Sequence, residues 1–244
     1  MIGCERYAVV SCHVESLLDD AVWRVFGQFQ NQAPGGFRIA ALLRPPDRDA
    51  GEAVRRWLER ARETAARSTL GHHTHWGGPA TARPVAGRTG ERVRREGDWL
   101  RNAGLKPTLF CGGGWYLDAE VAKAVADLGY TDCTATSFRP TYLAAEEPHL
   151  EVHGPCWLKL ATGNRLLELP TTHSLGMLVR AVLRKAELRE PLVHFYFHDT
   201  DLLDRRRRAA IRGVLALLAR RRVPADLDRV AWEAASEELP THRI

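Results

Sequence analysis

Three histidines lie close together in the stretch "TLGHHTHWGGP", residues 69–79. In an extended segment, alternate side chains point to the same side, so His73 and His75 share a side and His72 points away. Two imidazoles on one side can supply two ligands to a divalent ion. We therefore expect His73 and His75 to bind a metal and His72 to pack or to form hydrogen bonds. The alternative is a polar surface loop, and the rest of the chain has to decide between the two.

A second pair with the same spacing lies near the start of the chain, in "SCHVES" (11–16). His13 and Glu15 are two residues apart and therefore also share a side. Glu15 is a candidate third metal ligand, and His13 is either a ligand or a general base. Imidazole and carboxylate together suit zinc, with cobalt, nickel or iron as alternatives. An open coordination position on such an ion activates water and polarises a carbonyl group.

A third group of titratable residues follows the apolar run in "HFYFHDTD" (194–201). His198 comes directly after "FYF" and is a candidate acid or electrostatic stabiliser. Asp199 is expected either to orient His198 or to cap the next helix. His194 lies within the apolar run, where a buried structural role is expected.

Residues with a possible role in binding substrate lie near these groups. The glycines at 112–114 let the backbone approach a ligand closely, so Gly113 is a candidate. Flat aromatic faces suit sugar rings, although core packing accounts for them equally well. A candidate cation follows the strand expected at 131–137. The aromatic and cationic candidates are Trp76, Trp115, Tyr116 and Arg139.

Short apolar runs alternate with helical stretches along the whole chain, in about seven βα units. This alternation predicts parallel strands covered by helices. We expect a closed or nearly closed barrel, with a doubly wound open sheet as the alternative, in one domain over residues 1–244. Reacting groups of such barrels lie at the C-terminal ends of strands, and histidines recur at four of the seven predicted ends. The predicted strands cover 7–14, 37–43, 68–76, 106–116, 131–137, 164–174 and 191–199, and the predicted helices cover 50–67, 87–105, 118–130, 175–188 and 200–221. Residues 140–165 are expected to form a long loop or a hairpin.

Composition excludes several classes of protein. The 244 residues include five scattered cysteines without a C-x-x-C pair, which argues against a zinc ribbon and against a disulfide scaffold. The chain has neither a signal-peptide pattern nor an apolar run of the roughly 20 residues that span a membrane, so we expect a cytoplasmic setting. The net charge of +5 comes mainly from arginine, densest at 205–208 and 220–222. These runs lack interleaved aromatic residues, so a solvated helix face is expected and a nucleic-acid partner is not.

In this order, the motifs resemble those of the polysaccharide deacetylase family, also called the NodB-homology family of carbohydrate esterases. The likeness spans residues 7–231 and rests on "SCHVES", "HTHWG", "FCGGGWYLD" and "FYFHDTDL". The resemblance implies a distorted (β/α)7 barrel, a divalent metal and removal of N- or O-acetyl groups from sugars.

The chain departs from the family pattern at three places. His13 stands where the family has its aspartate base, and Gly77 stands where the second histidine of H-[ST]-x-x-H is expected. His75 is the candidate replacement for that histidine. The usual arginine of the "FCGGGWYLD" motif corresponds to Cys111 or a glycine. We therefore predict a metal-dependent hydrolase of an N-acetylated sugar or related small amide. The alternatives are a C–N hydrolase of a non-sugar substrate and a non-catalytic barrel that binds a carbohydrate or another ligand.

Overall fold

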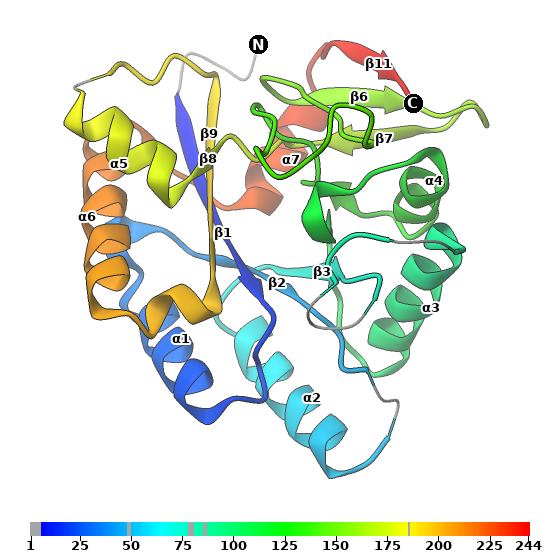
Figure 1. Ribbon diagram of the computed structural model, residues 1–244, viewed down its shortest axis with the longest axis horizontal. Helices are drawn as coiled ribbons and strands as arrows, with labels where there is room; N and C mark the ends of the chain where they lie inside the picture. Colours follow the sequence, from blue (N-terminus) through cyan, green and yellow to red (C-terminus); the bar gives the residue numbers. More distant parts are fainter. Residues whose placement is uncertain (1–5, 48–49, 78–80, 85–86, 185) are drawn as a thin grey trace.

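The computed structural model describes residues 6–47, 50–77, 81–84, 87–184 and 186–244. Over these ranges the strands form one sheet, and helices α1 to α6 surround it (Figure 1). The strands are β1 (Tyr7–Val14), β2 (Ala40–Leu43), β3 (Leu70–Thr74), β4 (Leu109–Gly112), β5 (Thr131–Asp132), β6 (Cys156–Lys159), β7 (Arg165–Glu168), β8 (His173–Ser174), β9 (Leu192–His198), β10 (Val223–Pro224) and β11 (Thr241–Arg243). The α-helices are α1 (Asp20–Gln32), α2 (Glu52–Ala65), α3 (Thr89–Asn102), α4 (Ala119–Asp127), α5 (Leu175–Leu183), α6 (Arg205–Arg221) and α7 (Leu227–Ala235), and the short 3-10 turns are η1 (Pro34–Gly36), η2 (Gly113–Trp115) and η3 (Asp199–Leu202).

The sheet has the predicted parallel character and the form of a distorted (β/α)7 barrel. Its strand order is β11-β6-β7-β5-β4-β3-β2-β1-β9-β8, and β10 pairs with β1. Every strand pair is parallel except β6 and β7, which form an antiparallel hairpin. The path ends at β8 on one side and at β11 on the other, so the sheet is not closed, and of the expected closed or nearly closed forms the fully closed one is excluded. One end strand, β8, has only two residues in its ladder with β9.

Strand β1 separates two parts of the core. All eight of its residues are buried. Ala8, Val10, Cys12 and Val14 join the cluster that packs against the outer helices, including Phe26 and Phe29 of α1. The alternate residues Tyr7 and Val9 join a second cluster with residues of β2, β4 and α7. This alternation follows from the period of two in a strand. It leaves the side chains at 11, 13 and 15 on the second, inner side.

Two helices, α7 and α1, were not predicted from the sequence, and the contacts of α1 show how that helix forms. Its N-terminus is capped by Asp19, whose Oδ1 accepts hydrogen bonds from the backbone N–H groups of Ala21 at 2.8 Å and Val22 at 3.0 Å. Its final turn, "QFQNQ", is polar and weakens the apolar periodicity that identifies a helix. Tertiary packing of Phe26 and Phe29 stabilises it instead.

Other predicted strands and helices are present, but their boundaries differ from the predicted ones. The strand expected at 37–43 begins at Ala40, and the strand expected at 131–137 is only Thr131–Asp132. The irregular stretch 140–165 ends in the β6–β7 hairpin. Helix α4 has caps at both ends, since Asp118 Oδ1 accepts from Val121 N at 2.8 Å and Gly129, after its last turn, has φ of 66°. None of the helices over the described ranges has the length and apolar character that a bilayer crossing needs.

Candidate metal centre

The predicted histidine and glutamate side chains come from the ends of β1, β3 and β9, three strands in the run β3-β2-β1-β9 of the sheet. In the ladder between β1 and β9, His13 is the register partner of His198. Strand β2 lies between β1 and β3, and its Leu42 pairs with both His13 and Gly71. Because the strands are parallel, their carboxyl ends meet at one edge.

Polar atoms of Glu15, His73 and His75 lie close together in one cluster. Glu15 Oε1 lies 3.3 Å from His73 Nε2 and 3.1 Å from His75 Nε2. The two Nε2 atoms are 3.2 Å apart. Both imidazoles are buried, and 27% of the Glu15 side chain is exposed. Three ligand atoms thus converge on one point that solvent can reach from the Glu15 side.

Hydrogen bonding fixes the orientation of His73. Its Nδ1 donates to the backbone carbonyl oxygen of Cys111 at 2.8 Å, which leaves Nε2 as the atom facing Glu15. An imidazole that ligates a metal usually donates its other N–H to such a carbonyl or to a carboxylate. Burial alone would raise the pKa of Glu15, but its contacts with the His73 and His75 imidazoles outweigh it and hold that pKa well below its usual range. Glu15 is therefore a carboxylate at neutral pH.

His13 lies beside this cluster, enclosed by rings. Its ring centroid is 4.4 Å from that of His73, 5.2 Å from that of His198 and 5.4 Å from that of Trp115. Its Nε2 lies 3.6 Å from Cys111 Sγ. Burial, and next the neighbouring imidazoles of His73 and His198, lower the pKa of His13 well below its usual value. His13 is therefore a neutral imidazole at neutral pH.

Two further sets of potential ligands overlap the first. Within each set the ligand atoms lie within 4.8 Å of one another, as they do in the Glu15, His73 and His75 set. Both additional sets contain His13, so its role as ligand or base stays open. These sets are His13, His73 and Cys111, and His13, Glu15 and His198.

His198 lies at the exposed side of the centre. Its Nε2 is 3.7 Å from Glu15 Oε1, and 40% of its side chain is exposed. The carboxylate that supports it belongs to Asp201, whose Oδ2 accepts from the His198 backbone N–H at 3.0 Å and lies 3.9 Å from His198 Nδ1. Sequence reasoning noted Asp201 near the strand end but did not select it. An acid three residues after a histidine, across a tight turn, is the signal that could have identified it.

Asp199 does not contact His198 through its carboxylate. Its Oδ2 accepts from Ser16 N and its Oδ1 from Thr200 N, each at 2.8 Å. Burial raises the pKa of Asp199 to about 7. Of the two predicted roles, the structural one at the start of η3 therefore fits the contacts, and Asp199 also holds the loop that carries Glu15.

His72 faces the other side of β3, as predicted. Its Nε2 lies 3.0 Å from Glu96 Oε2 and 2.8 Å from Thr74 Oγ1, and the Thr74 hydroxyl donates to the same carboxylate at 2.8 Å. Arg92 Nε also donates to Glu96, at 2.7 Å. His194 is likewise buried and structural, with Nε2 2.8 Å from Ser11 Oγ.

The predicted substrate-binding residues divide into two groups. Trp115 contacts the centre directly, because its ring lies 5.4 Å from that of His13. The Trp76 and Tyr116 rings pack edge to face at 5.6 Å, with the Tyr116 hydroxyl donating to Asp118 Oδ2 at 2.7 Å. They form an aromatic wall on the loops after β3 and β4.

Gly113 and Arg139 have contacts that differ from those expected. A Cβ atom on Gly113 would come within 2.6 Å of Thr74 O and 2.9 Å of His75 Cδ2, so the glycine lets η2 pack on the loop that carries His75. The Arg139 guanidinium donates to backbone carbonyls of its own loop, among them Glu147 O at 3.2 Å. These contacts give Gly113 and Arg139 supporting roles.

Comparison with proteins of known structure identifies the fold. The chain resembles a candidate polysaccharide deacetylase from Mycobacterium smegmatis, with a TM-score of 0.68 and 14% identity over 98% of this chain and 94% of that one. It also resembles a 4-alpha-glucanotransferase from Thermococcus litoralis (TM-score 0.61, 11% identity, 98% of this chain and 42% of that one). A CE4 family pseudoenzyme from Bacillus anthracis matches with a TM-score of 0.54 and 10% identity, over 99% of this chain and 70% of that one. No family model matches the sequence, and no curated protein matches it. The resemblance inferred from the motifs is thus confirmed at the level of the fold.

Proposed function

We propose that this chain, which has the fold of polysaccharide deacetylases, is a metal-dependent hydrolase that removes an acetyl or other acyl group from an N-acylated sugar or related small amide. The observation that carries the proposal is the convergence of Glu15 Oε1, His73 Nε2 and His75 Nε2, with mutual distances of 3.1–3.3 Å. Three residues from two separate strand ends direct ligand atoms to one point.

The donor set fits a divalent metal. Two imidazole nitrogens 3.2 Å apart, with a carboxylate oxygen beside both, match the combination that zinc takes at catalytic sites. Zinc is therefore our first choice, with cobalt, nickel or iron as alternatives. When bound, such an ion would lower the pKa of a water molecule and polarise the acyl oxygen. The hydrogen bond from His73 to Cys111 O supports the set, because it leaves the right nitrogen free for a ligand role.

The replacement of the family's second histidine has a local explanation. At Gly77, an added Cβ would lie 2.8 Å from Thr81 Cβ, and the Gly77 backbone N–H donates to Thr81 O at 3.0 Å. A histidine at 77 would therefore clash with Thr81. His75 directs its Nε2 at Glu15 from two residues earlier, which supports an H-x-H pair in place of H-[ST]-x-x-H.

The remaining histidines suit proton transfer. His13 is neutral and can accept a proton, which favours the role of general base at the position of the family's aspartate. His198 is partly exposed and lies 3.7 Å from Glu15 Oε1, on the side where a leaving amine can depart. We assign it the role of general acid, with Asp201 holding it in position. A separate base and acid is the arrangement that amide hydrolysis requires.

The aromatic side chains favour a ring-shaped substrate. Trp76, Trp115 and Tyr116 supply flat apolar faces that suit a sugar ring. The four cysteines in the described ranges are free and buried, which agrees with a reducing, cytoplasmic setting and hence with a small substrate in place of a wall polymer. The residues named here also allow a C–N hydrolase of a small non-sugar amide.

The test combines elemental analysis of the purified protein with acetate release from a panel of N-acetylated sugars and small amides. We expect about one divalent ion per chain and acetate release that a chelator abolishes. The alternative is a non-catalytic barrel that binds a ligand. The presence of His13 at the position of the family's aspartate base favours this alternative. Absence of metal, without rescue by added zinc, cobalt or nickel, would support that alternative and reject hydrolysis.

A further inference from the structure

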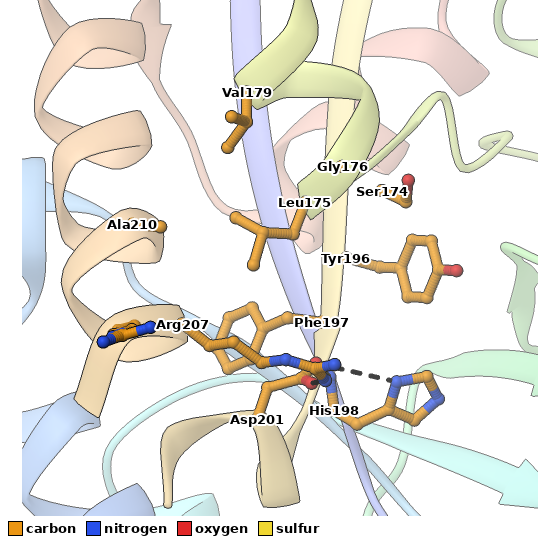
Figure 2. Close-up of a pocket in the computed structure, with 11 residues that line it drawn as sticks. Ser174, Leu175, Gly176, Val179, Tyr196, Phe197, His198, Asp201, Arg207 and Ala210 are labelled. Carbon is orange, nitrogen blue, oxygen red and sulfur yellow. Dashed lines mark hydrogen bonds and ion pairs between the residues drawn. The ribbon is translucent and has the colours of Figure 1, made fainter. Parts of the chain in front are cut away.

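A cavity of about 590 Å³ lies beside His198, on the side of the chain where the sheet is open. Figure 2 shows Leu175 and Val179 of α5 pointing toward Ala210 of α6, with Phe197 of β9 below them. Phe197 is almost fully buried. These four side chains give the cavity an apolar wall. Its volume lies in the range of about 300–1,000 Å³ that small-molecule sites occupy.

The opening toward the metal centre follows from the sheet topology. Strand β8 pairs only with Phe195 and Tyr196 of β9, so Phe197 and His198 have no strand beside them on that side. The cavity borders both Tyr196 and His198 at this point. In Figure 2 the His198 ring and the Tyr196 ring lie on the far side of β9 from Ala210. A ligand in the cavity can therefore extend past the end of β9 to His198.

The polar rim of the cavity carries surplus positive charge. Arg206 and Arg207 line it, opposed by the single carboxylate of Asp201. Arg207 Nη1 lies 2.6 Å from Asp201 Oδ1. Within the described ranges, Arg206 forms no ion pair. One guanidinium group at the rim is therefore available to an anion.

The position of these arginines opposes helix stability. Arg205 to Arg208 occupy the first turn of α6, which contains no acidic residue. The N-terminus of a helix carries partial positive charge, so cations there are unfavourable and repel one another. Asp204 caps the turn through backbone N–H groups and Asp201 pairs with Arg207, so two carboxylates face four guanidinium groups. An anion held at this rim relieves the repulsion.

We propose that this cavity binds a ligand that combines a phosphate or carboxylate group with an apolar body. The anionic group lies at Arg206 and Arg207, and the apolar body lies against Leu175, Val179 and Phe197. That this ligand is part of the substrate, extending to His198, rests on the proposed hydrolase function. Binding itself does not require metal or turnover.

The first test measures binding of phenyl phosphate to the full chain by calorimetry, before and after treatment with a chelator. The comparison probes are phenyl glucoside, which lacks the charge, and inorganic phosphate, which lacks the apolar body. We expect phenyl phosphate to bind most tightly and the chelator to leave its affinity unchanged. Loss of binding after chelation, or equal affinity for phenyl glucoside, would overturn the proposal.

Matched variants locate the site. Arg206→Met should weaken phenyl phosphate binding about fivefold, in line with a charge pair at a partly exposed site. Arg205→Met removes the same charge one residue away and should change the affinity less than about twofold, because Arg205 does not line the cavity. Ala210→Phe should fill the cavity and abolish binding, whereas Ala209→Phe, on the exposed side, should not. Thermal unfolding of each variant checks that it is folded.

The outcomes separate this proposal from the proposed function. Equal losses in the Arg205 and Arg206 variants would indicate diffuse attraction to the arginine run and would reject the cavity as a site. Acetate release together with failure to bind phenyl phosphate would reject the cavity proposal and leave hydrolysis standing. Site-specific binding of phenyl phosphate by a protein that holds no metal and releases no acetate would support the cavity proposal and reject the proposed hydrolysis.

Discussion

Glu15 Oε1 lies 3.1 Å from His75 Nε2, although the two residues are 60 positions apart in the sequence. Glu15 follows β1 and His75 follows β3, and the intervening strand β2 sets the distance between them. The same carboxylate oxygen also lies 3.3 Å from His73 Nε2. Glu15 is therefore the residue that joins the two histidines to the first strand, and its loss should have the largest effect on the centre.

Replacing Glu15 with Gln should remove the bound metal. Loss of a residue that hydrogen-bonds to a metal ligand costs about 10- to 100-fold in metal affinity. Loss of a ligand itself should therefore cost more than about 100-fold. Elemental analysis after dialysis and a metal titration measure the effect. Glu91→Gln, at an exposed position on α3, is the control and should retain full occupancy. A fully occupied Glu15→Gln protein would show that the ion, if any, lies elsewhere.

Adjacent histidines on β3 should give opposite results. His73→Ala should lower both metal content and turnover. His72→Ala should keep the metal but destabilise the protein by about 3 kcal/mol, because it leaves the largely buried Glu96 carboxylate, 13% exposed, without one of its partners. Burial opposes ionisation of Glu96, yet hydrogen bonds from His72 and charge from Arg92 lower its pKa. Urea unfolding and elemental analysis on both variants separate the two roles, and metal loss in His72→Ala alone would reverse the assignment.

Asp201 should act on turnover through His198. Asp201→Asn should lower kcat about tenfold. This loss is smaller than the 100-fold or more expected from removing the general acid itself. KM and metal content should stay unchanged.

The control for that variant is Asp204→Asn, which changes an acid three residues later. Asparagine remains a good helix cap, so α6 should keep its stability and kcat its value. A merely structural role for Asp201 would lower the stability of the Asp201→Asn protein and leave its kcat unchanged.

Gly113→Ala should destabilise the protein by about 1–3 kcal/mol, the usual cost of overpacking. The new Cβ would meet two backbone oxygens, Thr74 O at 2.6 Å and Ala82 O at 2.7 Å. Because it would also press on His75, metal affinity should fall. Gly213→Ala, in the interior of α6 with no atom near the new Cβ, should instead stabilise by up to about 1 kcal/mol. Denaturant unfolding compares the two directly.

Stability should fall as the pH falls below about 6.5, in part because of His194. Burial lowers the pKa of His194 from 6.5 to about 4. Between these values the unfolded chain binds a proton that the folded chain does not, so stability is present above 6.5 and is lost toward pH 4. At pH 5 the loss from this group should be about 2 kcal/mol. Chelator-treated protein should be used, to exclude effects of metal release.

The comparison for the pH experiment is His194→Gln, which cannot titrate. Its unfolding free energy should change less between pH 7.5 and pH 5 than that of the unaltered chain. Equal slopes in the two proteins would mean that His194 is protonated to the same extent in the folded and unfolded states.

Periodicity within each strand made much of the centre predictable. The rule that alternate side chains share a side paired His13 with Glu15 and His73 with His75, and separated His72 from them. Parallel βα units then required their ends to meet at one edge. These are local consequences of backbone geometry, so one sequence is enough to derive them.

Relationships across loops were not predictable in the same way. Asp199 is next to His198 in sequence, but the turn of η3 directs its carboxylate to Ser16, and Asp201 takes the position beside the imidazole. Likewise, the contact that makes Gly113 necessary comes from the Thr74 backbone. Such contacts depend on how separate loops pack, which periodicity does not encode. The opening of the sheet beside β8 was also not predictable from periodicity, for the same reason.

The central position of β1 has a consequence for synthesis of the protein. Ser11 of β1 forms its hydrogen bond with His194, 183 positions later, and β1 is buried along its whole length. A nascent chain that has not yet reached β9 therefore carries an apolar strand with one side unpaired. Such long-range pairing forms slowly, and the exposed segment is prone to aggregate. The pairing of β1 with β9 can form only late in translation, so ribosome-bound fragments should need chaperones until the last third of the polypeptide emerges.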